Sequence, residues 1–140
     1  MKVLDTNIVS ELIRQKPNKH VLQWVNAQDT KDLALTSISV AELLYGATRL
    51  PDGKRKTALK SILLNIFAED FHNRIIPFDD IAAAHYADLV VKREKAGRPI
   101  NMGDAQIAAI CQAYDAILVT RNIKDFGGLD LSLINPWDEE

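Results

Sequence analysis

The sequence has a single cysteine and no long apolar run, and each absence excludes a class of protein. Cys111 cannot form an internal disulfide and has no second thiolate with which to bind zinc, so we expect a reducing compartment, the cytoplasm. No apolar stretch approaches the roughly 18 residues of a membrane span. The chain also reaches an acidic residue, Asp5, where a secretory signal peptide carries its apolar stretch. These features predict an unexported protein that does not enter a membrane.

An excess of positive charge is missing too. The formal net charge is -2 at pH 7, which disfavours a uniformly basic nucleic-acid-binding protein. Two local basic groups remain, one made of Arg49, Lys54, Arg55, Lys56 and Lys60, the other of Lys92, Arg93, Lys95 and Arg98. Taken alone, they fit the solvated faces of two helices as well as they fit a phosphate-binding surface.

The 140 residues, of which 47% are apolar, fit one domain spanning residues 1–140 with a core that needs no disulfide. Short apolar segments alternate with longer segments of helical spacing, and this alternation predicts a three-layer α/β/α sandwich around a mainly parallel sheet. The expected strands are residues 3–4, 33–36, 74–78, 116–120 and 131–134. The expected helices are residues 7–14, 20–27, a helix beginning at 39, then 59–67, 81–91 and 102–114. Ile81, Ala84, Ala87 and Val91 mark the fifth helix.

Three carboxylates occupy equivalent positions in this pattern. Asp5 follows the first strand, Glu42 lies in the first turn of the helix after the second strand, and Asp104 lies in the first turn of the helix before strand 116–120. Helices that cover a parallel sheet run antiparallel to its strands, so their N-termini gather at the carboxyl edge, where ligands usually bind. We therefore expect the three acids on one rim, which Asn122 also joins.

Each acid also has a purely structural explanation as part of a helix cap. Asp5 can cap the first helix, while Ser39 with Glu42, and Asn101 with Asp104, each match a capping box. Capping explains Asp104 less well, because apolar residues three, four and seven positions later share its helical face and point it inward. Glu42 lacks that support, so its membership of the site depends on the rim alone.

A cation would remove the cost of gathering these acids. Carboxylates about 5 Å apart repel by roughly 3 kcal/mol per pair at an effective dielectric constant near 20. Because the donors are all oxygen atoms, the set favours Mg²⁺, or Mn²⁺ as its substitute, over zinc. Such an ion suits phosphate-ester hydrolysis, in which it activates a water and stabilises the leaving oxygen. The supporting hydroxyl and amide groups are expected from Thr6, Asn7, Thr120 and Asn122.

Four segments, in this order along the chain, resemble the PIN-domain ribonucleases. They are Val3-Leu4-Asp5-Thr6-Asn7, Ser39-Val40-Ala41-Glu42-Leu43 before Tyr45-Gly46, Gly103-Asp104-Ala105-Gln106-Ile107-Ala108-Ala109, and Val119-Thr120-Arg121-Asn122 before Asp125-Phe126. The resemblance covers essentially the whole chain. It is strongest to VapC-type toxins of the FitB kind, which also end in a motif like Asn135-Pro136-Trp137. It implies that the catalytic residues are Asp5, Glu42, Asp104 and Asn122, with Asp5 and Asp104 as metal ligands and Glu42 as a further candidate.

The resemblance implies an Mg²⁺-dependent endoribonuclease that is toxic to its own cell and is silenced by a VapB/FitA-type antitoxin. It also implies a homodimer that contacts operator DNA only through the antitoxin. An acidic site needs cations nearby to hold an RNA backbone. The RNA-binding candidates are therefore Arg49, Lys54, Arg55, Lys56, Lys60, Arg98 and Arg121, whereas Trp24 and Trp137 are interpreted as structural.

One departure from the family pattern leaves the number of metal ions open. Many PIN domains have a fourth acid where this chain has Asn122, and here an acid follows three residues later, at Asp125. Two other functions stay open as well. A phosphatase of the haloacid-dehalogenase kind also begins with a strand that ends in Asp, but it needs a second Asp where this chain has Asn7. A non-catalytic module could keep the PIN fold only to sequester a partner, although the three acids argue against it.

Overall fold

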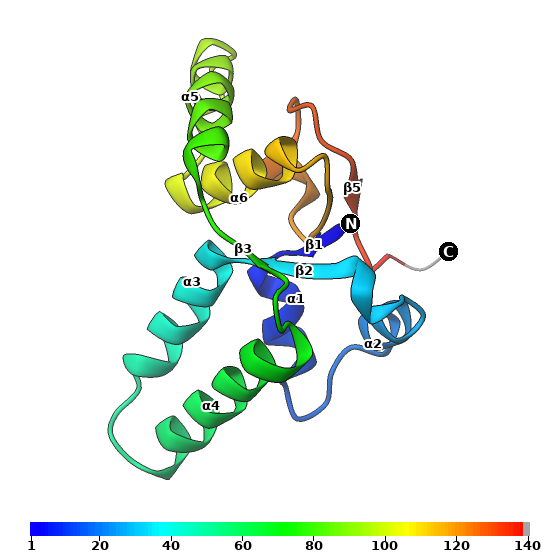
Figure 1. The fold of residues 1–140 in the computed structure, drawn as a ribbon, viewed down its shortest axis with the longest axis vertical. Helices are drawn as coiled ribbons and strands as arrows, with labels where there is room; N and C mark the ends of the chain where they lie inside the picture. The colour runs from blue at the N-terminus through cyan, green and yellow to red at the C-terminus, as the bar shows by residue number, and fades with distance from the viewer. Residues whose placement is uncertain (139–140) are drawn as a thin grey trace.

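The structure is a computed structural model that describes residues 1–138. Five parallel strands form one sheet in the order β3-β2-β1-β4-β5 (Figure 1). The strands are β1 (Lys2–Leu4), β2 (Leu33–Thr36), β3 (Ile75–Ile76), β4 (Ile117–Val119) and β5 (Leu133–Ile134). The predicted parallel sheet is confirmed.

Helices cover both faces of this sheet. They are α1 (Thr6–Leu12), α2 (Lys19–Asn26), α3 (Ser37–Thr48), α4 (Lys54–Asn65), α5 (Asp80–Lys95) and α6 (Met102–Ala113). Shorter turns are η1 (Thr30–Asp32), the π-helical η2 (Ile66–Asp70) and η3 (Ile123–Phe126). No helix within residues 1–138 is long and apolar enough to cross a membrane.

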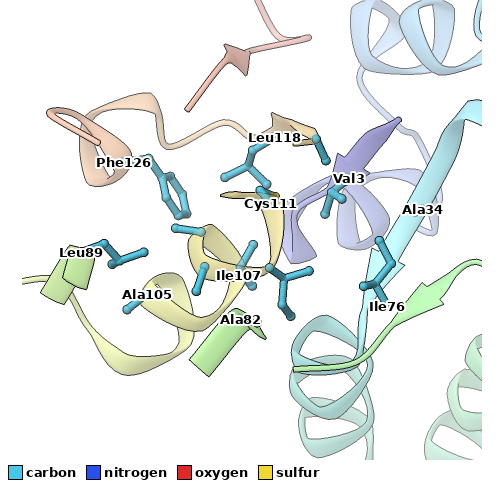
Figure 2. Packing of buried hydrophobic residues seen from close by; sticks show 14 residues of the cluster. Val3, Ala34, Ile76, Ala82, Leu89, Ala105, Ile107, Cys111, Leu118 and Phe126 are labelled. Atoms are coloured by element: carbon cyan, nitrogen blue, oxygen red, sulfur yellow. The ribbon is translucent and has the colours of Figure 1, made fainter. Parts of the chain in front are cut away.

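Alternation along the strands divides the core into two halves. Val3 and Leu118 belong to a cluster with residues of α5, α6 and η3, whereas Leu4 and Val119 belong to a second cluster with residues of α1 to α4. Successive side chains of a strand point to opposite faces, so each central strand contributes to both clusters. Figure 2 shows the first cluster, where Cys111 of α6 is buried with the strand residues. The α/β/α sandwich is therefore confirmed.

The order of the strands locates the edge where a ligand is expected. From β1 the chain builds β2 and β3 on one side of the sheet, and it then places β4 and β5 on the other. The direction of strand addition thus reverses between β1 and β4. In open parallel sheets, ligands bind beyond the carboxyl ends of the strands at such a reversal.

Helix α3 begins earlier than predicted. Thr36, the last residue of β2, caps it, because the Thr36 hydroxyl accepts a hydrogen bond from the Ser39 amide at 3.1 Å. Strand and helix therefore join without a loop, and the predicted start at Ser39, with its capping box to Glu42, is wrong. Glu42 lies in the second turn of α3 and not in the first.

Helix α5 is present where predicted, but its marker residues do not face the core. Ile81, Ala84, Ala87 and Val91 are all exposed. The buried positions are Ala82, Leu89 and Arg93, which lie on the side of α5 toward α6 and η3. Apolar spacing revealed the helix, but its packing against α6 and a buried arginine decide which face is covered.

The predicted strand 74–78 is reduced to Ile75–Ile76 at the edge of the sheet. Pro77 follows directly and has no N–H with which to continue the ladder, so the strand ends there. The last strand is also shorter than the predicted 131–134.

Candidate active site

Asp5 lies at the reversal point between β1 and β4 and caps α1. Its Oδ1 accepts a hydrogen bond from the Thr6 amide at 2.8 Å, and its Oδ2 accepts one from the Thr120 hydroxyl at 2.8 Å. A longer contact of 3.4 Å joins the Asn7 side-chain amide to the same Oδ2. The Asp5 amide donates to the Val119 carbonyl at 2.8 Å. Two strand ends therefore fix this carboxylate, and its capping role does not exclude a chemical one.

Burial makes the Asp5 carboxylate costly to ionise. The residue is only 5% exposed, and this burial is the main reason why its pKa is raised from 3.8 to about 6. The hydrogen bonds from Thr120 and Thr6 oppose the rise, whereas the negative charges of Asp104 and Glu42 add to it. The three acids, which we call the acidic rim, are thus close enough to repel one another. A proton or a cation at this point relieves that repulsion.

Contacts with the first residues of α1 and α6 place the Glu42 side chain on the rim. Its Oε1 accepts a hydrogen bond from the Thr6 hydroxyl at 2.5 Å, and the same hydroxyl lies 2.9 Å from the buried Ser39 Oγ. Its Oε2 lies over Gly103, so that a β-carbon at Gly103 would approach this oxygen to 2.7 Å. Glu42 therefore occupies the space between the N-termini of α1 and α6, and the lack of a side chain at Gly103 leaves room for it.

Asn101 caps α6 as predicted, but the Asp104 carboxylate meets the Asn101 side chain and not the backbone amide that a capping box requires. The Asp104 amide donates to Asn101 Oδ1 at 2.8 Å, and the Asn101 side-chain amide donates back to Asp104 Oδ2 at 2.9 Å. Partial burial is the first cause of the raised pKa of Asp104, and the charges of Asp125 and Glu42 raise it further. The hydrogen bond from Asn101 and the charge of Arg93 act in the opposite direction. Asp104 thus belongs both to a cap and to the rim.

Asp125 is a fourth acid near the rim, and the sequence pattern did not include it among the site residues. Its segment is held by Arg93, which is 5% exposed and donates to the carbonyls of Arg98, Asp125 and Gly127 at 2.7, 2.9 and 3.2 Å. Arg93 is therefore a buried residue that connects α5 to η3 through hydrogen bonds. Its interpretation as part of a basic surface is wrong. The position of Asp125 three residues after Asn122 was the available signal.

The family model for the PIN domain matches residues 2–127. The chain belongs to the PIN-domain family. It is 38% identical to the VapC ribonuclease Y4jK of Sinorhizobium fredii, over 99% of both chains. It is 35% identical to toxin FitB of Neisseria gonorrhoeae, over 99% of this chain and 100% of FitB.

Solved structures of PIN-domain relatives match as well. The crystal structure of FitAcB from Neisseria gonorrhoeae superposes with a TM-score of 0.93, at 35% identity, over 99% of this chain and 100% of that one. VapBC2 from Rickettsia felis, bound to a DNA fragment from its promoter, gives a TM-score of 0.82 at 33% identity over 98% of both chains. The chain is thus a VapC/FitB-type PIN nuclease, and the dehalogenase-type interpretation is not needed.

The predicted supporting residues of this PIN domain do not all act on the same acid. Thr120 supports Asp5, whereas the Thr6 hydroxyl supports Glu42. Asn122 lies beside them, because its backbone amide donates to the Thr120 hydroxyl at 3.0 Å. Its side-chain amide makes no hydrogen bond within residues 1–138, so a role for it in the site stays a prediction.

The RNA-binding candidates fall into two groups. Arg98 and Arg121 lie by the loops at the rim: the Arg98 guanidinium donates to the Lys124 carbonyl at 3.3 Å, and the Arg121 amide donates to Asn7 Oδ1 at 3.4 Å. The others, Arg49, Lys54, Arg55, Lys56 and Lys60, lie on the pair α3 and α4, which extends away from the sheet (Figure 1). Arg49 follows Glu42 by seven residues, about 10 Å along the axis of α3.

The donor set fits a hard cation that keeps part of its water shell. Within the described residues, no three His, Cys, Asp or Glu side chains converge closely enough to hold one ion by themselves. Mg²⁺ is commonly bound by one or two carboxylates and keeps several waters. Asp5 and Asp104 can supply the two carboxylates, so the site does not need protein ligands on every side of the ion. Cys111 does not contribute, because burial, and to a lesser degree the charge of Asp5, raises the pKa of its thiol to about 12.

Proposed function

We propose that residues 1–140 form a single Mg²⁺-dependent endoribonuclease domain that acts as the toxin of a toxin–antitoxin pair. The observation that carries the proposal is the buried Asp5 carboxylate at the strand reversal, with a pKa raised by burial and by the charges of Asp104 and Glu42. The names of two relatives over the whole chain, a VapC ribonuclease and toxin FitB, support the same activity.

Each acid of the rim has a proposed role. Asp5 and Asp104 would hold Mg²⁺, with Mn²⁺ as a substitute, and the ion when bound would activate a water and stabilise charge on the phosphodiester. Thr120 and Thr6 keep the Asp5 carboxylate in place through the two hydrogen bonds described above. Thr6 also orients Glu42, which would complete the charge of the site, and the Asn122 amide would support it from the neighbouring loop.

The direct test is cleavage of RNA by the purified chain with Mg²⁺, with Mn²⁺ and with a chelator. Asp5→Asn and Asp104→Asn are each expected to lose most of the activity while remaining folded. Asp32→Asn is the matched control, because Asp32 is exposed and precedes β2, at the opposite edge of the sheet. Wild-type activity in either rim variant would refute the assignment of that residue.

We also propose that the chain acts in the cytoplasm, where a VapB/FitA-type antitoxin silences it. Rickettsia felis VapBC2 binds promoter DNA, and by analogy this chain would contact operator DNA only through its antitoxin. The homodimer implied by the family resemblance stays a prediction, which sedimentation velocity of the purified chain can check.

The alternative of a non-catalytic PIN-fold module is decided by the same cleavage assay. Such a module would bind RNA or its partner without cutting RNA under any metal condition. Absence of cleavage in protein that is folded and binds Mg²⁺ would favour this alternative.

A further inference from the structure

The motif Asn135-Pro136-Trp137 follows β5 and lies beside the loop after β4. The Thr120 amide donates to the Ile134 carbonyl at 2.8 Å, which brings the motif beside the candidate active site. Asn135 Oδ1 accepts a hydrogen bond from the Trp137 amide at 2.9 Å, as in an Asx turn. The Asn135 side-chain amide also approaches the Arg121 carbonyl at 3.4 Å. Asn135 therefore links the backbone of Arg121 to that of Trp137.

The side chains of Arg121 and Trp137 also meet. The Arg121 Cζ lies 5.0 Å from the centroid of the Trp137 ring, within the range of a cation–π contact. The ring is partly buried and packs against the apolar cluster of α1 to α4. Arg121 is exposed, and within residues 1–138 its guanidinium donates no hydrogen bond and forms no ion pair. Contact with an aromatic face leaves the in-plane N–H groups of a guanidinium available for a planar or tetrahedral anion.

The backbone of Arg121 borders the acidic rim, and its guanidinium lies on the side of Trp137 and Glu11. The Arg121 amide contacts Asn7, whose side chain in turn contacts Asp5 Oδ2. Along α1, Glu11 follows Asn7 by one helical turn, and Arg121 contributes least among the causes that lower the pKa of Glu11. The Glu11 carboxylate is already held by the Asn18 amide at 2.8 Å and by Arg14 at 3.1 Å. Glu11 therefore does not consume the binding capacity of Arg121.

We propose that Arg121 binds the RNA phosphate next to the scissile one and that Trp137 is its positioning residue. This inference rests on the proposed ribonuclease function. A chain that carries three acids at its centre repels an RNA backbone, so an exposed cation on the loop beside the acidic rim gives the neighbouring phosphate a partner. The indole ring positions the guanidinium and leaves its positive charge intact, whereas a carboxylate partner would neutralise that charge. The ring packs against the apolar cluster as interpreted from the sequence, and its contact with Arg121 adds a positioning role to that packing.

The test combines RNA binding and cleavage for Arg121→Gln, Arg121→Lys, Trp137→Leu, Trp137→Phe and the double variant Arg121→Gln/Trp137→Leu. Binding of a single-stranded oligonucleotide is measured over a range of NaCl concentrations in an Asp104→Asn background, so that the RNA stays intact. Lys31→Gln is the matched control for loss of one positive charge, because Lys31 is exposed in η1 before the amino end of β2. Thermal melting shows which variants are folded.

Arg121→Gln is expected to reduce the slope of log affinity against log salt by about 0.7 to 1, which corresponds to one phosphate contact. It should raise KM more than it lowers kcat. Arg121→Lys should keep the slope but bind more weakly, and Trp137→Leu should raise KM several-fold while Trp137→Phe stays near wild type. The double variant should bind no more weakly than Arg121→Gln alone, because Trp137 acts only through Arg121.

Additive losses in the double variant, or an unchanged salt slope in folded Arg121→Gln, would overturn the proposal. So would Arg121→Gln protein that binds RNA normally and loses only its affinity for the antitoxin. Failure of the proposed ribonuclease function gives a different result. In that case the wild-type chain would cleave no RNA under any metal condition, regardless of how its RNA affinity depends on salt.

Discussion

The Thr120 hydroxyl, at the end of β4, donates a 2.8 Å hydrogen bond to the Asp5 carboxylate at the end of β1. The same hydroxyl accepts a hydrogen bond from the Asn122 amide at 3.0 Å. One completely buried side chain therefore connects the acid at the strand reversal to the loop that follows β4. This connection explains why a small polar residue directly follows the apolar strand β4.

Thr120→Val is expected to impair the site while Thr120→Ser preserves it. Valine keeps the shape of threonine but removes the donor to Asp5 and the acceptor for the Asn122 amide. The loss should destabilise the protein by about 1–3 kcal/mol and reduce metal affinity or activity by roughly 10–100-fold. Calorimetric Mg²⁺ titration and RNA cleavage measure both effects. Equal activity of the valine and serine variants would show that the hydroxyl has no role.

The sequence predicted the architecture because its central strands are short apolar runs between helical segments, as a buried parallel sheet requires. It did not predict the covered face of α5. Arg93 is buried there, since the carbonyls of Asp125 and Gly127 accept its N–H groups. Those acceptors come from a segment more than 30 residues away, and no local periodicity reports on them.

The candidate site could be predicted only where topology alone determines the position of a residue. Asp5 and Asp104 lie near strand or helix ends, so topology alone brings them to one edge. The predicted position of Glu42 in α3 was wrong, but its place on the rim follows from its contacts with Thr6 and Gly103. These contacts depend on how α3, α1 and α6 pack together, which the sequence does not state.

The metal-free protein is expected to be less stable at pH 7 than near pH 5. The folded pKa of Asp5 is about 6, above its ordinary 3.8, so the native state holds a proton that the unfolded chain has already released. Stability therefore falls as the pH rises from about 4 to about 6, by roughly 3 kcal/mol at most. Partly buried Asp104 acts in the same direction.

Thermal melting in a chelating buffer between pH 5 and pH 7.5 checks this expectation. Asp5→Asn should flatten the dependence and raise the melting temperature at pH 7, whereas the control Asp32→Asn should behave like wild type. Added Mg²⁺ should stabilise wild type at pH 7. A melting temperature that rises steadily with pH in metal-free wild type would contradict the prediction.

Gly103→Ala is expected to reduce cleavage without loss of stability. The added methyl group would meet Glu42 Oε2 at 2.7 Å, and this flexible carboxylate can move away from it. Alanine in place of glycine favours a helix by about 1 kcal/mol, so the variant should melt at the same or a higher temperature. Glu42, however, would leave its position between α1 and α6.

Gly46→Ala is the matched control for this substitution. A β-carbon at Gly46, in α3, meets no atom within 4 Å, so the change should stabilise the helix and leave cleavage unaffected. Comparison of kcat for the two variants isolates the displacement of Glu42. Full activity of Gly103→Ala would mean that the position of Glu42 is unimportant for the reaction.

The antitoxin is expected to compete with Mg²⁺ for the acidic rim. The simplest inhibitor is an Arg or Lys side chain of the antitoxin inserted between Asp5 and Asp104. There it replaces the positive charge of the metal and excludes water from the site. Asp5 is buried, so removing one partner of such a pair should weaken the complex by roughly 2–5 kcal/mol.

Antitoxin affinity should therefore fall as the Mg²⁺ concentration rises, and it should fall again in Asp104→Asn, while Asp32→Asn binds normally. Titration calorimetry over a series of Mg²⁺ concentrations measures both effects. If affinity responds to neither change, the antitoxin works elsewhere, for example by covering the basic side chains of α4.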